Sequence, residues 1–343
     1  MTTDHIRLGI TLGDPSGIGP ELIARTISRL RDSKDYRDVQ FIVIGDERNL
    51  KEGERTAGVS LGLPVVESVE AASQHGTAPV LLNYSTCGPG EFPMGEVSRT
   101  AGKAAFDTLV HALELSRAEE LFGFVFGPLN KEAMHLGGNP YSSELEFFQA
   151  VFKQDNIENE LNYLDEMWTT RVTSHVALSE VCPLITTERV LSTIRFMHSV
   201  LTDYGHSRPK IAVAALNPHA GEHGLFGREE MDQIAPAIEQ ARSLGIEADG
   251  PFPADTVFIR VRKEKYHGLV SMYHDQGQIA MKLAGFERGV TVAGGLPVPI
   301  STPAHGTAHD IAGRGVADPG ATLEAIRVVC SMIRNRHAAR SPA

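Results

Sequence analysis

The chain is poor in cysteine, in long apolar runs and in basic residues. Its three cysteines, Cys87, Cys182 and Cys330, are far apart, and no Cys-x-x-Cys pair occurs. A disulfide framework or a thiolate zinc site is therefore not expected, and a reducing cytoplasm fits this cysteine usage. No apolar run approaches membrane-spanning length, and residues 1–17 lack the basic-then-apolar pattern of a signal peptide. We expect a cytoplasmic protein with no membrane partner.

Basic side chains are outnumbered, with 32 lysines and arginines against 43 aspartates and glutamates and a net charge of -11. This balance argues against sequence-independent nucleic-acid binding, which depends on neutralising phosphates with basic side chains. A locally basic pocket for a small anion is still compatible with it. A chain of 343 residues with 42% hydrophobic residues is long enough for two globular domains.

Short apolar runs alternate with longer helical patterns, which is typical of an α/β protein. Strands are expected at Arg7–Leu12, Val39–Ile44, Leu121–Phe126, Lys210–Leu216, Thr256–Val261 and Gly268–Tyr273. Helices are expected at Gly19–Leu30, Thr100–Arg117, Thr187–Tyr204, Glu229–Leu244, Gln276–Leu283 and Ala321–Asn335.

Clusters of glycine, proline and polar residues fall at the ends of predicted strands. They are GDPSGIGPE (13–21), GPLNKEAMHLGGNPY (127–141), NPHAGEHGLFG (217–227), YHDQG (273–277) and HGTAHDIAGRG (305–315). In open α/β sheets, ligands bind beyond the carboxyl ends of strands, so these loops indicate a site. The turn at Asp14 is neither GxGxxG nor a P-loop. It is a loop suited to close approach by a ligand or a generic tight turn.

Three histidines, His175, His219 and His274, each follow a strand-like run. Imidazole nitrogen suits zinc and other divalent metals, and three protein ligands leave coordination positions open. The alternative is three ordinary hydrogen-bonded histidines at strand ends. Asp275 directly follows His274 and is suited to orienting that ring or to proton transfer, unless it only caps the next helix. Lys131 is a candidate carboxylate ligand or general acid, or else a solvated loop lysine.

Taken together, the loops resemble the PdxA family, named for 4-hydroxythreonine-4-phosphate dehydrogenase of pyridoxal phosphate biosynthesis. GDPSGIGPE, GPLNKEA, NPHAGEHGLFG, GPFPADTVF, YHDQGQIAMK and HGTAHDIAG occur in one order across nearly the whole chain. The resemblance implies an α/β, isocitrate/isopropylmalate dehydrogenase-like fold with two α/β domains flanking an active-site cleft. We expect residues 1–140 plus 314–343 in the first domain. Residues 141–313 would form the second, with the metal histidines and the dimer interface.

The resemblance also implies the ligands. It places one divalent metal on His175, His219 and His274 across a homodimer interface. Zinc is the expected metal, with magnesium, manganese or cobalt as alternatives. The segment 305–313 would form part of a non-Rossmann site for NAD, or for NADP. The residues expected at the cofactor are Asp14, His305, Gly306, Thr307, Ala308 and Asp310. Lys282 matches a substrate-binding lysine of the family.

Four further positions predicted to contact substrate depart from the family pattern. Glu144 and Leu145 stand where members acting on 4-phosphohydroxythreonine have His-Thr, while Thr291 replaces an asparagine and Ile300 an arginine. Because phosphate binding needs several donors and positive charge, these departures favour a substrate without phosphate.

The sequence therefore predicts a metal-dependent, NAD-dependent dehydrogenase that oxidises a secondary alcohol β to a carboxylate and then decarboxylates it. A carboxylated cis-dihydrodiol, such as that made from terephthalate, is the predicted substrate. Lys131 and Asp275 are the candidates for proton transfer. The first alternative is 4-hydroxythreonine-4-phosphate or a related sugar-acid phosphate as substrate. The second is a non-catalytic protein of this fold that binds a metal or a carboxylate.

Overall fold

The computed structural model describes residues 5–153 and 160–340. The chain divides into two compact units, one of Met1–Asn156 and Leu296–Ala343, the other of Ile157–Gly295. Residues 141–156 and 296–313 thus fall in the first unit, whereas the sequence had suggested the second. In the described part of the chain, no helix is both long enough and apolar enough to cross a membrane.

The first unit is built on a parallel sheet with strand order β3-β4-β2-β1-β5-β12. The strands are β1 (Ile6–Thr11), β2 (Val39–Gly45), β3 (Val65–Val66), β4 (Val80–Asn83), β5 (Gly123–Phe126) and β12 (Ile300–Pro303). Every residue of β2 and β5 is buried. This is the pattern expected of parallel strands covered on both faces by helices.

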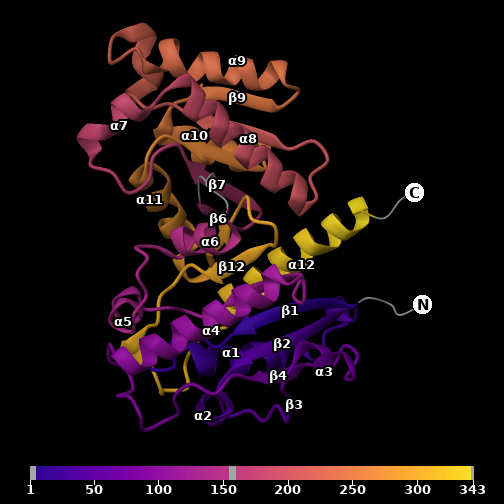
Figure 1. Cartoon of the computed structure of the whole chain (residues 1–343). Coiled ribbons are helices and arrows are strands. Elements are labelled where there is room, and N and C mark those ends of the chain that lie inside the picture. Colours follow the sequence, from indigo (N-terminus) through magenta and orange to yellow (C-terminus); the bar gives the residue numbers. More distant parts are fainter. Residues whose placement is uncertain (1–4, 154–159, 341–343) are drawn as a thin grey trace. The chain divides into compact units, whose positions relative to one another are not determined.

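Helices connect and cover these strands. They are α1 (Gly19–Leu30), α2 (Glu47–Ala57), α3 (Val69–Ser73), α4 (Arg99–Arg117), α5 (Lys131–Leu136), α6 (Glu144–Phe152) and α12 (Gly320–Arg340). The chain passes from β1 to β2 through α1 and later returns to β5 through α4. Although α12 is last in the sequence, it packs on β1, β5 and β12 (Figure 1). The unit is therefore a doubly wound α/β structure, with strand order reversing at β1.

Two glycines let α4 and α5 approach closely enough for their backbones to touch. A Cβ atom at Gly102 of α4 would overlap the carbonyl group of Ala133 in α5, and one at Gly137 would overlap the backbone nitrogen of Lys103. Asn130 caps α5, accepting a hydrogen bond from the Ala133 backbone N–H at 2.8 Å. These contacts position the start of α5 beside the end of β5.

The second unit has strand order β11-β6-β7-β10-β8-β9. Its strands are β6 (Glu160–Leu164), β7 (Met167–Arg171), β8 (Lys210–Ala214), β9 (Glu247–Phe252), β10 (Gly268–Ser271) and β11 (Val290–Ala293). The pairs β11–β6 and β6–β7 are antiparallel, while β7, β10, β8 and β9 run parallel to one another. Trp168 and Tyr163 are among its largest fully buried side chains.

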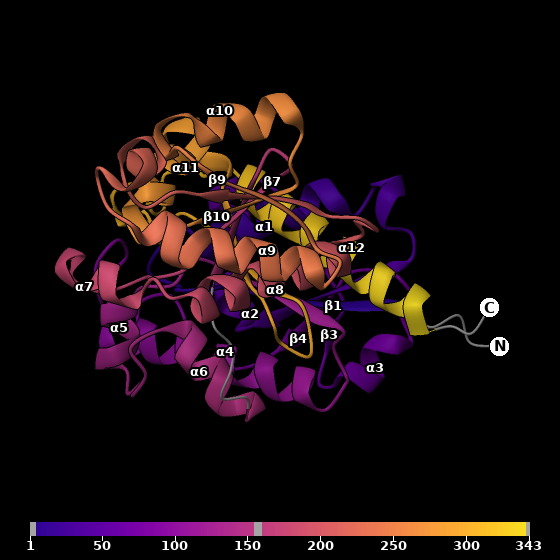
Figure 2. The same cartoon turned by 90° about the horizontal axis from the view of Figure 1, so that it is seen from above.

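Helices cover both faces of this second sheet. They are α7 (Leu178–Leu184), α8 (Thr187–Tyr204), α9 (Ala235–Ser243), α10 (Ala254–Glu264) and α11 (His274–Gly285). Figure 2 shows strands β7, β9 and β10 between α10 and α11 on one side and α8 and α9 on the other. A turn of π-helix at Glu230–Ile234 precedes α9, so the helix predicted over Glu229–Leu244 is interrupted.

One predicted element has the wrong secondary structure. Thr256–Val261, expected as a strand because of its β-branched and aromatic residues, lies inside α10. Val257 and Val261 are both buried, and a spacing of four residues places them on one face of a helix. Packing of that face on the sheet outweighs the preference of β-branched residues for strands.

The cysteines form no disulfide. Cys87 and Cys330 are buried and Cys182 is exposed. Burial raises the pKa of the Cys330 thiol to about 12 and that of Cys87 to about 11, so both thiols stay protonated near neutral pH.

Two histidine rings pack against each other at the amino ends of β8 and β10, tilted by 42°. The ring centroids of His206 and His267 are 4.1 Å apart, and His267 Nδ1 accepts a hydrogen bond from the Lys210 backbone N–H at 2.9 Å. His206 Nε2 is buried with no hydrogen-bond partner among the described residues. Burial, and for His206 the neighbouring His267, lowers the pKa of each imidazole.

Acid is therefore expected to destabilise the fold through this pair. Because both pKa values are lowered on folding, the unfolded chain takes up protons first as the pH falls through about 6.5. The free energy of unfolding, measured by urea denaturation, should decrease between about pH 7 and pH 5, and His206→Phe should reduce that decrease. The exposed His75→Gln is the matched control. An unchanged pH dependence in His206→Phe would exclude this role.

Candidate functional site

In the first unit, polar groups gather where strand order reverses. Strand β5 lies between β1 and β12 and runs parallel to both. Their carboxyl ends therefore meet at one edge of the sheet. Asp14 follows β1, Lys131 follows β5, and the segment 305–313 follows β12. This edge is where open α/β sheets bind ligands.

Asp14 is completely buried in the turn after β1. Its Oδ1 accepts hydrogen bonds from the Ser16 backbone N–H at 2.9 Å and hydroxyl at 2.8 Å, and its backbone N–H donates to Pro128 O at 2.9 Å. Burial raises the pKa of Asp14, although the bonds from Ser16 oppose this shift. The other carboxylate oxygen, Oδ2, has no partner among the described residues. A buried acceptor left unsatisfied is suited to a polar group of a ligand.

The segment after β12 packs directly on this turn. The Ile18 backbone N–H donates to Thr307 O at 3.0 Å, and a Cβ atom at Gly17 would lie 2.7 Å from the same oxygen. Glycine at position 17 is thus required for the close approach. Ala308 adopts a left-handed conformation with φ of 44°.

The remaining residues predicted at the cofactor lie on the same segment. His305 and Gly306 are adjacent, with His305 Nδ1 3.1 Å from Gly306 O, and Asp310 is exposed. His309 was missed. Its Nε2 lies 3.4 Å from Ser16 Oγ, and its charge lowers the pKa of Asp14. Its place inside HGTAHDIAG was the available signal.

Lys131 and Glu144 form an ion pair within the first unit. Lys131 Nζ lies 3.4 Å from Glu144 Oε2, and the Glu144 side chain is only 16% exposed. Leu145, the next residue of α6, is partly buried. Ile300 is completely buried in β12 and pairs with Phe124 of β5. As described, Ile300 has no exposed atom to offer a substrate.

In the second unit, the three predicted metal ligands follow neighbouring parallel strands. Strand β10 lies between β7 and β8, and His175, His274 and His219 follow β7, β10 and β8 respectively. The His175 and His274 ring centroids are 5.5 Å apart. His274 Nδ1 lies 2.6 Å from Asp275 Oδ1, which leaves Nε2 as the nitrogen suited to a metal.

His219 lies in a strained loop. Five consecutive residues, His219 to His223, have positive φ, and only Gly221 is glycine. Left-handed backbone costs roughly 1–2 kcal/mol for each non-glycine residue. The buried Glu230 carboxylate supports the loop, since its Oε1 accepts from the backbone N–H groups of Leu216 at 2.9 Å and Asn217 at 2.7 Å. Such strain is concentrated at functional sites.

Gln276 joins the ends of β10 and β8. Its side-chain oxygen accepts from the Met272 backbone N–H at 2.6 Å, and its side-chain nitrogen donates to Ala215 O at 2.8 Å. These bonds hold the strand ends that lead to His274 and His219. Sequence reasoning missed this positioning role, although Gln276 stands within the YHDQG motif.

A polar network extends across β7, β6 and β11. The buried Arg171 donates to Glu160 Oε2 at 3.2 Å and to Asn162 Oδ1 at 3.4 Å. The Asn162 side-chain nitrogen in turn donates to Thr291 Oγ1 at 3.4 Å. Thr291 is therefore held in a network that contains a buried guanidinium. Lys282 lies exposed on α11.

The three histidines are chemically suited to bind a divalent metal, but within one chain they are not placed to do so. Imidazole with a carboxylate behind it is a common metal ligand. However, residues 5–153 and 160–340 of one chain contain no group of three histidine, cysteine, aspartate or glutamate side chains placed to bind a metal. Two histidines meet, and the third does not complete the site within the chain.

Comparisons with known proteins agree on one family. The family described as "Pyridoxal phosphate biosynthetic protein PdxA" matches residues 37–329. A Pseudomonas aeruginosa relative, provisionally named 4-hydroxythreonine-4-phosphate dehydrogenase 2, is 47% identical over 96% of this chain and 98% of its own length. A Symbiobacterium thermophilum relative, provisionally named D-threonate 4-phosphate dehydrogenase, is 40% identical over 94% of this chain and 95% of its own.

Solved structures give the same result. A 4-hydroxythreonine-4-phosphate dehydrogenase from Burkholderia phymatum is 33% identical with a TM-score of 0.79, covering 96% of this chain and 98% of that one. A terephthalate 1,2-cis-dihydrodiol dehydrogenase from Burkholderia xenovorans LB400 is less similar, at 26% identity and a TM-score of 0.67, with coverage of 95% and 98%.

The buried Asp14 carboxylate leads to a test. Its pKa is raised on folding, so ionised Asp14 costs stability at neutral pH, and Asp14→Asn should keep or increase the free energy of unfolding. If Oδ2 meets the cofactor, the same variant should bind NAD at least about tenfold more weakly by calorimetry.

Asp38→Asn is the control, because Asp38 pairs with Arg334 and precedes β2 at the opposite edge of the sheet. It should bind NAD normally. Unchanged NAD binding by Asp14→Asn would remove Asp14 from the cofactor site.

Proposed function

The chain belongs to the PdxA family, and we propose that it is an NAD-dependent dehydrogenase acting on a 4-phosphorylated, four-carbon hydroxy acid. 4-Hydroxythreonine-4-phosphate and D-threonate 4-phosphate, taken from the names of relatives, define this substrate class. The observation that carries the proposal is the packing of the 305–313 segment on the Asp14 turn, at the edge where three parallel strands end.

Two of the departures that favoured an unphosphorylated substrate carry less weight in the structure. Glu144 faces Lys131, which offsets its negative charge, and Ile300 is buried. A carboxylated cis-dihydrodiol remains the second candidate. Two observations support this second candidate. Lys131 is already paired with Glu144, and Leu145, the next residue, is apolar and partly exposed.

Within the first unit, Asp14 and the segment 305–313 hold the cofactor in this proposal. A bound NAD, or NADP, would supply a hydride acceptor for the carbinol carbon. Oxidation of the substrate alcohol then yields a ketone β to the carboxylate. The proposed second step is loss of that carboxylate as carbon dioxide. Lys131 offers an ammonium donor for proton transfer. In the second unit, Asp275 orients His274 and is the other candidate for proton transfer.

His175, His219 and His274 would hold one divalent metal, zinc first among the candidates and magnesium, manganese or cobalt after it. Such an ion would supply Lewis-acid stabilisation of negative charge on the substrate hydroxyl oxygen. Lys282 and Thr291 are the residues of this unit proposed to contact substrate.

A homodimer with shared sites follows from the same proposal. Exposed apolar side chains flank all three metal histidines: Val176 and Leu178 after His175, Leu225 and Phe226 after His219, and Ile279 and Leu283 on α11. Apolar side chains gathered near a site commonly mark an interface. A second copy that covered them would also supply the histidine that the single chain lacks.

Substrate turnover tests the proposed class. Metal-loaded protein should produce NADH with 4-hydroxythreonine-4-phosphate or D-threonate 4-phosphate at least about a hundredfold faster, as kcat/KM, than with a carboxylated cis-dihydrodiol. Absorbance at the NADH band is the measurement. Faster turnover of the dihydrodiol would reverse the assignment, and no NADH from any of the three substrates would count against dehydrogenase activity.

Mixing inactive variants tests the shared metal site. His175→Ala and His219→Ala should each lose metal and activity. If His175 and His274 act with His219 of the partner subunit, half of the dimers in a reassociated mixture are mixed and contain one intact site. About a quarter of the original activity should then return.

The matched control is His223→Ala, which alters the same left-handed loop but none of the proposed ligands. It should retain metal, as measured by elemental analysis. No recovery on mixing, with mixed dimers verified by mass spectrometry, would place all three histidines in one chain.

A further inference from the structure

The start of α1 holds the chain on both sides of the segment 305–313. Near the beginning of that segment, the Ile18 backbone N–H donates to Thr307 O at 3.0 Å. Beyond its end, Glu21 Oε1 accepts a hydrogen bond from the Ala317 backbone N–H at 2.9 Å. The segment expected at the cofactor is therefore tied to one helix at two points.

Arg25, one turn further along α1, strengthens the second of these links. Its Nε donates to Glu21 Oε1 at 3.1 Å, and its Nη2 donates to Gly315 O at 2.5 Å. Gly315 is left-handed, with φ of 70°, and a Cβ atom there would lie 2.8 Å from Thr56 O. The planar guanidinium thus bridges a buried carboxylate and a closely packed backbone carbonyl, which suits the fixed fork of arginine.

Apolar side chains pack the segment on the same helix between the two links. Ile18, Leu22 and Ala317 form a buried cluster, and Ala308 and Ile311 pack against it. Ala308 and Ile311 both lie inside the segment 305–313. A shift of Ala317 would therefore move the surface on which the predicted cofactor residues rest.

The pair of Glu21 and Arg25 is poorly suited to a purely stabilising role. The Glu21 side chain is only 3% exposed, against 26% for Arg25. The second carboxylate oxygen of Glu21, Oε2, is buried with no hydrogen-bond partner in the described part of the chain. Because burying charge costs free energy, and more so when an acceptor stays unsatisfied, such a pair adds little net stability. Specifying one backbone conformation is a role better matched to it.

We propose that Glu21 and Arg25 are positioning residues for the cofactor. They fix the backbone at Gly315 and Ala317 and thereby hold the segment 305–313 in the conformation that binds NAD. The inference rests on the proposed function, because it takes this segment as part of the NAD site. Neither side chain is assigned a contact with cofactor or substrate, so their loss should weaken NAD binding without changing the chemical step.

Calorimetric titration of the full-length protein with NAD tests the proposal. Arg25→Gln should weaken NAD binding at least about fivefold, since it removes the bonds to Glu21 and Gly315. Arg25→Lys should have an intermediate effect, because an ammonium group keeps the charge but not the fork. In steady-state kinetics, the KM for NAD should rise in both variants while kcat and the substrate KM stay unchanged.

A purely structural pair predicts a different pattern. Arg25→Gln would then lower the free energy of unfolding, measured by urea denaturation, and leave the dissociation constant of NAD unchanged. That result would overturn the proposal.

A double-mutant cycle tests whether the two side chains act together. Glu21→Gln should also weaken NAD binding. The double variant Glu21→Gln/Arg25→Gln should bind NAD no more weakly than the weaker single variant, because both substitutions break one link. Fully additive losses would contradict a shared positioning role.

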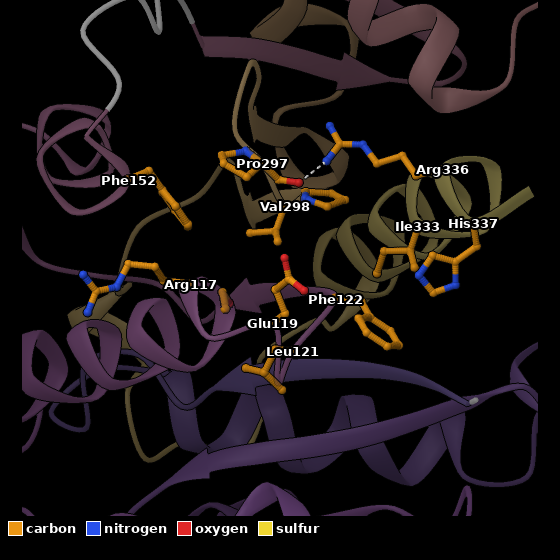
Figure 3. A pocket seen from close by; sticks show the side chains of 12 residues that line it. Arg117, Glu119, Leu121, Phe122, Phe152, Pro297, Val298, Ile333, Arg336 and His337 are labelled. Atoms are coloured by element: carbon orange, nitrogen blue, oxygen red, sulfur yellow. Dashed lines mark hydrogen bonds between the residues drawn. The ribbon is translucent and has the colours of Figure 1, made fainter. Parts of the chain in front are cut away.

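Two further variants serve as matched controls. Arg29→Gln removes an exposed positive charge from the same helix. Arg336→Gln removes a comparable link before the other end of β12, where Arg336 Nη1 donates to Pro297 O at 2.7 Å (Figure 3). Both variants should bind NAD as the original protein does. An equal loss in Arg336→Gln would mean that general loosening around β12 governs NAD binding, against the proposal.

Failure of the proposed function would give a distinct result. The original protein itself would then bind no NAD, and the positioning role would fall with it. Normal NAD binding by the original protein, with unchanged binding in Arg25→Gln and Glu21→Gln, would overturn the positioning role alone.

Discussion

Parallel pairing brings the ends of β1, β5 and β12 to one edge of the first sheet and those of β7, β10 and β8 to one edge of the second. Residues far apart in the chain are thereby brought together. The turn that carries Asp14 contacts Thr307 in this way, through Ile18, and the ring of His175 lies beside that of His274. Each candidate site therefore depends on strands that are themselves buried and apolar.

Each candidate site contains a feature that lowers the stability of the fold, and the surrounding packing offsets it. Asp14 is desolvated with one oxygen unsatisfied, and the His219 loop runs through consecutive left-handed residues. Neither feature would persist in isolation, because each is unfavourable by local preference. Ser16 and Glu230 hold them through short hydrogen bonds. Gln276 likewise holds two strand ends, because its side chain hydrogen-bonds the backbone of both Met272 and Ala215.

The local sequence pattern was enough to predict long helices. Gly19–Leu30 and Thr187–Tyr204 were predicted at the bounds found for α1 and α8, because each has a clear apolar face and a clear end. It failed at Thr256–Val261, where β-branched residues lie on the buried face of a helix. It also could not place the domain boundaries, since no change in composition marks the chain near 156 or 295.

The sequence by itself determined the α/β class, the polar loops at strand ends, and the family, because these depend on local composition and on motifs in order. Tertiary structure alone decided which loops meet, since strand order is set by long-range pairing. It also gave Glu144 a partner in Lys131 and buried Ile300, which changed the reading of the substrate.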